Sequence, residues 1–187
     1  MINLSDYPIF EAEMETLADT AIDPQHPHEA PLTLSCLPAV NFDRVKDKHV
    51  STLSNVIEQP SSVDALLQFP ESVAMVEFKN GEIDNKTQRN LRDKVRDSLL
   101  IFCEITNTTV EITRNYFELI LVYNEEKNSP SKSDTPSKQV IKNEIFRKAG
   151  TEEILFTLKR FKGLYFHEVH TYTAEQFKAY LSAHFPT

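Results

Sequence analysis

Residues 61–80 read SSVDALLQFPESVAMVEFKN, and this stretch decides the fold that the sequence predicts. Two short runs of apolar and β-branched residues flank Pro70 and Glu71, which is the pattern of a β-hairpin. If the hairpin is symmetric about that pair, facing residues have numbers that sum to 141, and Asp64 lies opposite Glu77. A connection of odd length would break this register, so the length of the loop decides whether the two acids meet.

Three charged side chains gather on one face of this predicted hairpin. Glu77 and Lys79 are two residues apart on a strand and therefore point the same way. Two carboxylates with β-carbons roughly 5 Å apart repel each other unless a proton or a cation compensates them. Because Mg²⁺ binds one or two carboxylates together with water and phosphate oxygens, Asp64 and Glu77 are the predicted ligands of Mg²⁺ or Mn²⁺. Lys79 would orient the attacking water or stabilise charge on a phosphate, and the predicted chemistry is phosphodiester hydrolysis.

Regular elements flank the hairpin on both sides. Apolar residues at helical spacing predict a helix that begins at residue 42, after the cap Asn41, and ends before Pro60. The same spacing predicts a second helix over 85–102, capped by Asn85, and the apolar run at 116–123 predicts a buried strand. The fold class is therefore α/β, with a mixed sheet on a helix-strand-strand-helix-strand core.

The remainder of the chain is expected to extend this sheet. Residues 124–139 are rich in Ser, Pro and Lys and predict a flexible loop. After it we expect a short helix over 141–150, a hairpin over 153–172 that turns near Gly163, and a closing helix over 174–185.

Asp64, followed by Glu77-Phe78-Lys79 on a hairpin between two helices, resembles the core of the PD-(D/E)XK (restriction-endonuclease-like) nuclease superfamily. The phrases SSVDALLQF and VAMVEFKNG also resemble small uncharacterised bacterial proteins of this type, and the resemblance covers residues 42–124 of the 187. It implies that Asp64 and Glu77 bind Mg²⁺, that Lys79 is catalytic, and that the substrate is nucleic acid. The chain departs from the family at Val63, which stands where the family has proline. Many members also take an acid from the first helix, for which Asp47 or Glu58 is a candidate here.

The helix after the hairpin carries candidate phosphate contacts. Lys86, Arg89 and Arg96 lie roughly on one side of it. Asp93 interrupts that stripe, so a solvated helix face with ion pairs is the alternative interpretation.

Charge is unevenly spread along the chain. Residues 1–40 contain seven acidic side chains and no Lys or Arg, which leaves 20 basic and 21 acidic residues in the remainder. We therefore expect an acidic, loosely docked N-terminal arm over 1–40 and a single domain over 41–187. The nearly neutral remainder creates no strong field that would attract a polyanion.

Composition excludes several classes of protein. The three glycines, Gly81, Gly150 and Gly163, are too few and too scattered for a Walker loop or a Rossmann fingerprint, and GxSxG and HExxH motifs are absent. Without a long apolar run or a CxxC pair, the sequence predicts a soluble cytoplasmic protein with no membrane partner and with Cys36 and Cys103 as free thiols.

Three functional interpretations stay open at this point. The first is an active Mg²⁺-dependent nuclease. The second is a catalytically silent protein of the same fold, acting as a binding, immunity or regulatory module for a basic protein partner, which the acidic arm favours. The third is an ordinary α/β protein in which Glu77 and Lys79 form an exposed pair of little energetic consequence. A further hypothesis is that the arm covers the site as a mimic of nucleic acid.

Overall fold

The computed structural model describes residues 2–23, 26–128 and 153–186. Over these residues the chain is an α/β protein with a six-stranded mixed open sheet, six α-helices and two short 3-10 helices. The strands are β1 (Met14–Thr16), β2 (Pro38–Asn41), β3 (Ala65–Gln68), β4 (Val73–Lys79), β5 (Phe117–Tyr123) and β6 (Glu168–Thr173). The helices are η1 (Leu4–Asp6), α1 (Pro8–Glu11), α2 (Leu17–Thr20), α3 (Phe42–Ser51), α4 (Asn85–Thr106), α5 (Val110–Tyr116), η2 (Leu158–Phe161) and α7 (Ala174–His184).

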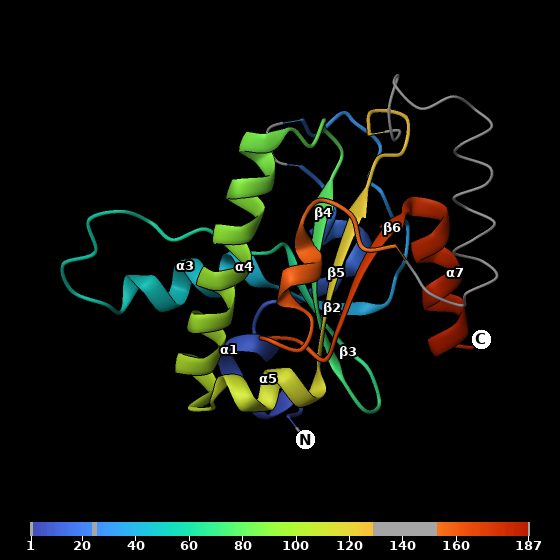
Figure 1. Ribbon diagram of the computed structural model, residues 1–187. Helices are drawn as coiled ribbons and strands as arrows, with labels where there is room; N and C mark the ends of the chain where they lie inside the picture. The colour runs from blue at the N-terminus through green and yellow to red at the C-terminus, as the bar shows by residue number, and fades with distance from the viewer. Residues whose placement is uncertain (1, 24–25, 129–152, 187) are drawn as a thin grey trace.

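The order of the strands in the sheet is their order in the chain, from β1 to β6. Strands β1 to β4 pair antiparallel, whereas β4, β5 and β6 run parallel. Figure 1 shows the sheet between two layers of helices, with α3 and α4 on one side and α7 on the other. This is a three-layer arrangement, with a hydrophobic core on each face of the sheet.

Alternation along β4 divides the side chains between these two cores. Met75 belongs to the core under α4, while Val76 and Phe78 belong to the core under α7 together with Phe177. Since successive side chains on a strand point to opposite faces, Glu77 must face α4. The alternation of side chains along β4 therefore decides that Glu77 is within reach of α4 and not of α7.

The predicted register of the β3–β4 hairpin is confirmed. Ala65 pairs with Val76 and Leu66 with Met75, so the numbers of facing residues sum to 141. The connection is symmetric about Pro70 and Glu71, and the Phe69 N–H donates to the Ser72 carbonyl at 2.8 Å.

Helix α3 begins where the sequence predicts and ends earlier. The side chain of Asn41 accepts from the Arg44 N–H at 3.0 Å, which confirms the predicted cap. The predicted end near Pro60 is wrong, because α3 stops at Ser51. The hydroxyl groups of Ser51 and Thr52 donate to carbonyl oxygens of the preceding turn. Such local bonds offer the backbone an alternative to the helix and weaken its continuation.

Helix α4 carries a cap that differs from the predicted one. The cap is Asp84 and not Asn85, and its carboxylate accepts from the Thr87 N–H at 2.7 Å. After α4 the chain forms the additional helix α5, which the sequence did not predict, before entering the predicted strand β5.

The C-terminal hairpin predicted over 153–172 is wrong. Phe156 and Thr157 have positive φ angles of 54° and 62°, which no regular strand allows, and η2 follows them. Only β6 is a strand, and it pairs parallel with β5. The closing helix is confirmed as α7, with a capping box between Thr173 and Gln176. The helix predicted over 141–150 and residues 129–139 of the predicted loop lie outside the described residues.

The expectation of a loosely docked arm over 1–40 is wrong for the part that the structure describes. β1 forms the edge of the sheet, and the side chains of Phe10 and Leu17 are fully buried. Two acidic side chains of the segment are also paired with bases of α3: Arg44 contacts Glu15 at 2.9 Å, and Lys48 contacts Glu13. These ion pairs therefore attach the segment to α3.

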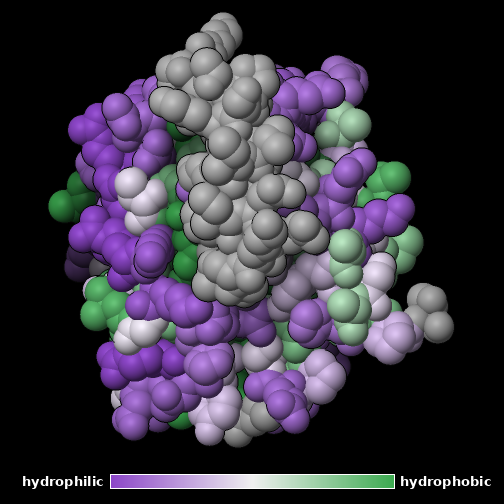
Figure 2. All heavy atoms as spheres, turned by 45° about the vertical axis from the view of Figure 1, so that its right-hand side comes forward, coloured by the Kyte–Doolittle hydropathy of each residue, from purple (hydrophilic) through white to green (hydrophobic). Residues whose placement is uncertain are grey.

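The surface is mostly polar on the side seen in Figure 2, where hydrophilic side chains predominate and apolar ones are scattered among them. No helix among the described residues is long and apolar enough to cross a membrane. Cys36 and Cys103 are both free.

Candidate functional site

The structure brings the three predicted site residues together. Asp64 directly precedes β3, and its Oδ2 accepts a hydrogen bond of 2.6 Å from the Phe78 N–H on β4. Beside it, Nζ of Lys79 lies 3.0 Å from Oε1 of Glu77. The hairpin therefore presents Asp64, Glu77 and Lys79 to the layer that contains α4.

A fourth residue, which the sequence reasoning missed, completes the group. Lys94 lies on α4, and its Nζ is 3.0 Å from Oε1 and 3.2 Å from Oε2 of Glu77. The same ammonium is 3.6 Å from Oδ1 of Asp64. One cation thus sits between the two carboxylates of the hairpin.

Burial differs among the four side chains. The Glu77 side chain is only 2% exposed, whereas those of Asp64, Lys94 and Lys79 are 18%, 22% and 29% exposed. A buried carboxylate without a partner is strongly unfavourable, and Glu77 has two ammonium groups as partners, those of Lys79 and Lys94.

Two groups of this site have displaced pKa values. Burial raises the pKa of the Asp64 carboxyl, and the neighbouring charge of Glu77 raises it further, although Lys94 opposes both effects. Burial lowers the pKa of Lys94, but the charges of Glu77 and Asp64 outweigh burial and raise it overall. Lys94 is therefore a permanent cation at neutral pH.

Asp64, Lys79 and Lys94 line a cleft of about 920 Å³, with residues of the N-terminal segment on its wall, and Glu77 lies buried behind them. Acidic side chains outnumber basic ones on this wall. The acidic residues are Glu15, Asp19, Asp23, Asp43, Asp64 and Glu82, and the basic residues are Arg44, Lys79 and Lys94.

The first helix offers a different acid from the two that the sequence suggested. Asp47 is 65% exposed and contacts Lys46, and Glu58 is exposed beyond the end of α3. Asp43 instead lines the cleft and accepts a hydrogen bond from the Ser62 hydroxyl. Its position in the first turn of α3 places it beside the hairpin.

The donor set fits a small divalent cation. Glu77 directs both of its oxygens, and Asp64 one of its oxygens, toward the same ammonium group, so a positive charge is already accommodated between them. Mg²⁺ needs no more than one or two carboxylates, with water and phosphate as further ligands. Among the described residues, no group of three His, Cys, Asp or Glu side chains could hold a metal ion, so this would be a two-carboxylate site.

The candidate phosphate contacts on α4 do not reach the cleft. The described lining takes Thr87 and Lys94 from α4, and not Lys86, Arg89 or Arg96. Arg96 contacts Asp93 at 3.3 Å and lies 6.0 Å from the centre of the Phe161 ring.

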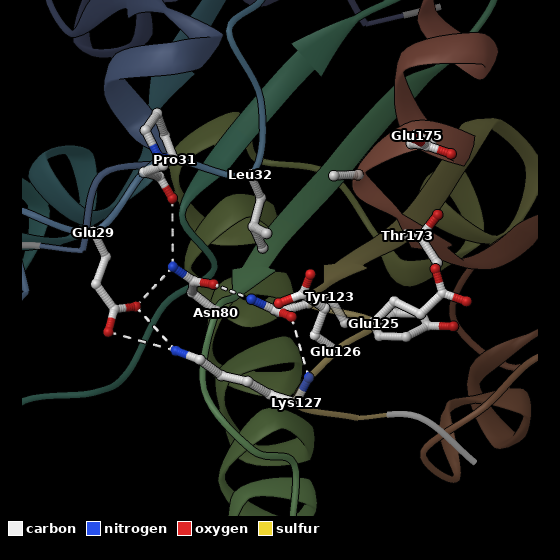
Figure 3. Close-up of a pocket in the computed structure, with 13 residues that line it drawn as sticks. Glu29, Pro31, Leu32, Asn80, Tyr123, Glu125, Glu126, Lys127, Thr173 and Glu175 are labelled. Carbon is white, nitrogen blue, oxygen red and sulfur yellow. Dashed lines mark hydrogen bonds and ion pairs between the residues drawn. The ribbon is translucent and has the colours of Figure 1, made fainter.

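A second cavity has a volume of about 510 Å³, and Figure 3 shows the residues that line it. Glu29 accepts from the Asn80 amide at 2.8 Å and contacts Lys127 at 3.2 Å. Asn80 and Leu32 line both cavities, so the segment around Leu32 lies between them. None of the predicted site residues lines this cavity within the described chain.

Comparison of the chain with models of protein families, with curated proteins and with solved structures finds no match in any of the three. The features of this chain that bear on function are therefore the cleft and the cluster of Asp64, Glu77, Lys79 and Lys94 beside it.

Proposed function

We propose that this protein is a Mg²⁺- or Mn²⁺-dependent phosphodiesterase that acts on nucleic acid through a site of the PD-(D/E)XK type. The observation that carries the proposal is the convergence of Asp64 and Glu77 on a single cation position, with Lys79 in contact with Glu77. The order α3, β3, β4, α4, β5 supports a restriction-endonuclease-like core, since it is the order that the resemblance implies.

Each side chain has a separate role in this proposal. Asp64 and Glu77 would hold the metal ion, which when bound lowers the pKa of a water ligand and withdraws charge from a phosphate oxygen. The Phe78 N–H fixes Oδ2 of Asp64, so the carboxylate keeps one orientation and presents Oδ1 to the cation position. Lys79 holds its ammonium beside the same position, where it can orient the attacking water and stabilise negative charge on the phosphate.

A second candidate function has its own observation. Lys94 already compensates both carboxylates, and the cleft carries an excess of acidic side chains. Both features suit a catalytically silent module that binds a basic segment of a protein partner, because complementary charge steers association.

Cleavage assays separate the two functions. Wild type is incubated with single-stranded DNA, double-stranded DNA and RNA in Mg²⁺ or Mn²⁺, with a chelator as blank. Glu77→Gln and Lys79→Met are compared with the matched substitutions Glu175→Gln and Lys178→Met, which lie exposed on α7 on the other side of the sheet. We expect cleavage to fall at least about a hundredfold in the first pair and to stay unchanged in the second.

Folded wild type that cuts none of these substrates would contradict the nuclease proposal. A stable complex with a basic protein that survives the chelator and Lys79→Met would then favour the binding module.

A further inference from the structure

Lys94 stands in the place that the proposed function gives to a metal ion. Its ammonium contacts both oxygens of Glu77 and also faces Oδ1 of Asp64. These are the oxygens that a divalent ion would need. A cation of charge +2 and an ammonium cannot share one position, because like charges at such a distance repel strongly in a partly buried site.

We propose that Lys94 is a built-in counter-ion: its ammonium occupies the cation position between Asp64 and Glu77 when no divalent ion is bound, and it is displaced when one enters. The inference rests on the proposed function, and it adds a means of regulating that site. The metal-free protein is kept stable by the lysine, and metal affinity is weakened by the same contact.

The surroundings of Lys94 allow this displacement. Its side chain reaches the carboxylates from α4 through a flexible four-carbon stem, and it is still 22% exposed to the cleft. Asp43 lines the same cleft, and its charge already acts on Lys94. Asp43 can therefore serve as the anionic partner of the displaced ammonium.

The displacement also couples metal binding to substrate. A phosphate group that enters the cleft offers Lys94 an alternative anion, because a lysine ammonium binds phosphate as a point charge. Bound substrate would thus draw the Lys94 ammonium away from the cation position. The metal would therefore bind more tightly in the presence of nucleic acid than in its absence.

Binding of Mn²⁺ to the protein without nucleic acid tests the inference independently of activity. Wild type, Lys94→Met, Glu77→Gln and the control Lys178→Met are titrated by calorimetry, and their thermal unfolding is followed with and without Mn²⁺. We expect Lys94→Met to bind Mn²⁺ at least about tenfold more tightly than wild type, and to unfold at a lower temperature when metal is absent. Lys178→Met should match wild type in both measurements.

The outcomes separate this inference from the proposed function. Equal Mn²⁺ affinity of wild type and Lys94→Met overturns the counter-ion and leaves the metal site standing. Absence of Mn²⁺ binding in wild type and Lys94→Met alike removes the metal site, and both proposals fall.

A second variant covers the case in which Lys94→Met does not fold without metal. Lys94→Gln keeps a hydrogen-bond donor for Glu77 and is measured in parallel. If neither variant shows a cooperative transition without metal, recovery of that transition by Mn²⁺ supports the inference, and failure to recover it overturns the inference.

Discussion

The two faces of β4 differ in the side chains that they carry: one face is apolar and the other is charged. On the side of α7, the β4 residues Val76 and Phe78 belong to the same hydrophobic core as Phe177. On the side of α4, Glu77 lies between Met75 and Lys79 and is covered by Lys94. One face contributes stability through packing, while the other contains charges whose burial opposes folding unless they are paired. The difference teaches that the charged face is where this fold accepts an energetic cost, and such sites are where function is to be sought.

The largest effect is expected on the apolar face. Phe177 is fully buried, and its ring centre lies 6.0 Å from that of Phe78. Phe177→Ala should lower the free energy of unfolding by about 3–5 kcal/mol, because it removes packed surface and leaves a cavity. Urea denaturation measures this loss. Mn²⁺ affinity of the folded variant should equal that of wild type, and a large change in affinity would show that the two faces are not independent.

A somewhat smaller loss is expected on the charged face. Glu77→Gln keeps the size of the side chain but leaves Lys94 with Asp64 alone and Lys79 without its contact to the carboxylate. We expect the free energy of unfolding to fall by about 2–4 kcal/mol in metal-free buffer. The exposed control Glu175→Gln should stay within about 0.5 kcal/mol of wild type. A similar small change for Glu77→Gln would mean that the charges of this face are not coupled to folding.

The smallest effect has the opposite sign. In the folded protein the pKa of Asp64 is raised from its ordinary 3.8 to about 8, so its contribution to stability is complete below the ordinary value, falls as the pH rises above it, and is fully lost once the pH passes the raised pKa. Asp64→Asn removes this penalty and retains an oxygen for the Phe78 N–H. At neutral pH it should stabilise the protein by about 1 kcal/mol, and near pH 4 the gain should vanish. Urea denaturation across this range provides the check, and destabilisation at neutral pH would contradict the expected sign.

The meeting of Asp64 and Glu77 was predictable because it depends on local information. The hairpin is short, its loop is symmetric, and strand parity places both acids on one face. The sequence could not show whether that face lay under a helix or toward solvent, which is why an exposed pair remained a possible interpretation.

Lys94 was missed although the sequence contained a signal for it. It lies three residues after Leu91 and four before Ser98, on the stripe of α4 that packs against the sheet, where both of these neighbours are buried. A lysine on the buried stripe of a helix requires an anionic partner. The only way to identify that partner as Glu77 was to know how α4 crosses β4, and this is tertiary information.

The prediction of a loosely docked arm over 1–40 was wrong because it relied on the acidic composition of the segment and not on the pattern of its apolar residues. Its acidic residues suggested an arm, but Phe10 and Leu17 are core residues, and short strands such as β1 leave too few residues for alternation to be visible. Glu13 and Glu15 of this segment pair with basic residues of α3, so the net charge summed over a segment says little about where that segment docks.

The agreement between strand order and chain order has a consequence for how the molecule is assembled. The β3–β4 hairpin closes across a short connection, whereas α4 and α5 lie between β4 and β5 in the chain. Because short loops close faster than long ones, we expect the two acids to come together early in folding and their lysine to arrive later. Pulse-labelling hydrogen exchange would show this as protection of hairpin amides before those of β5. The folding chain would thus pass through a stage in which Asp64 and Glu77 are close together but Lys94 does not yet contact them. A divalent ion present at that stage would compete with the Lys94 ammonium for the two carboxylates.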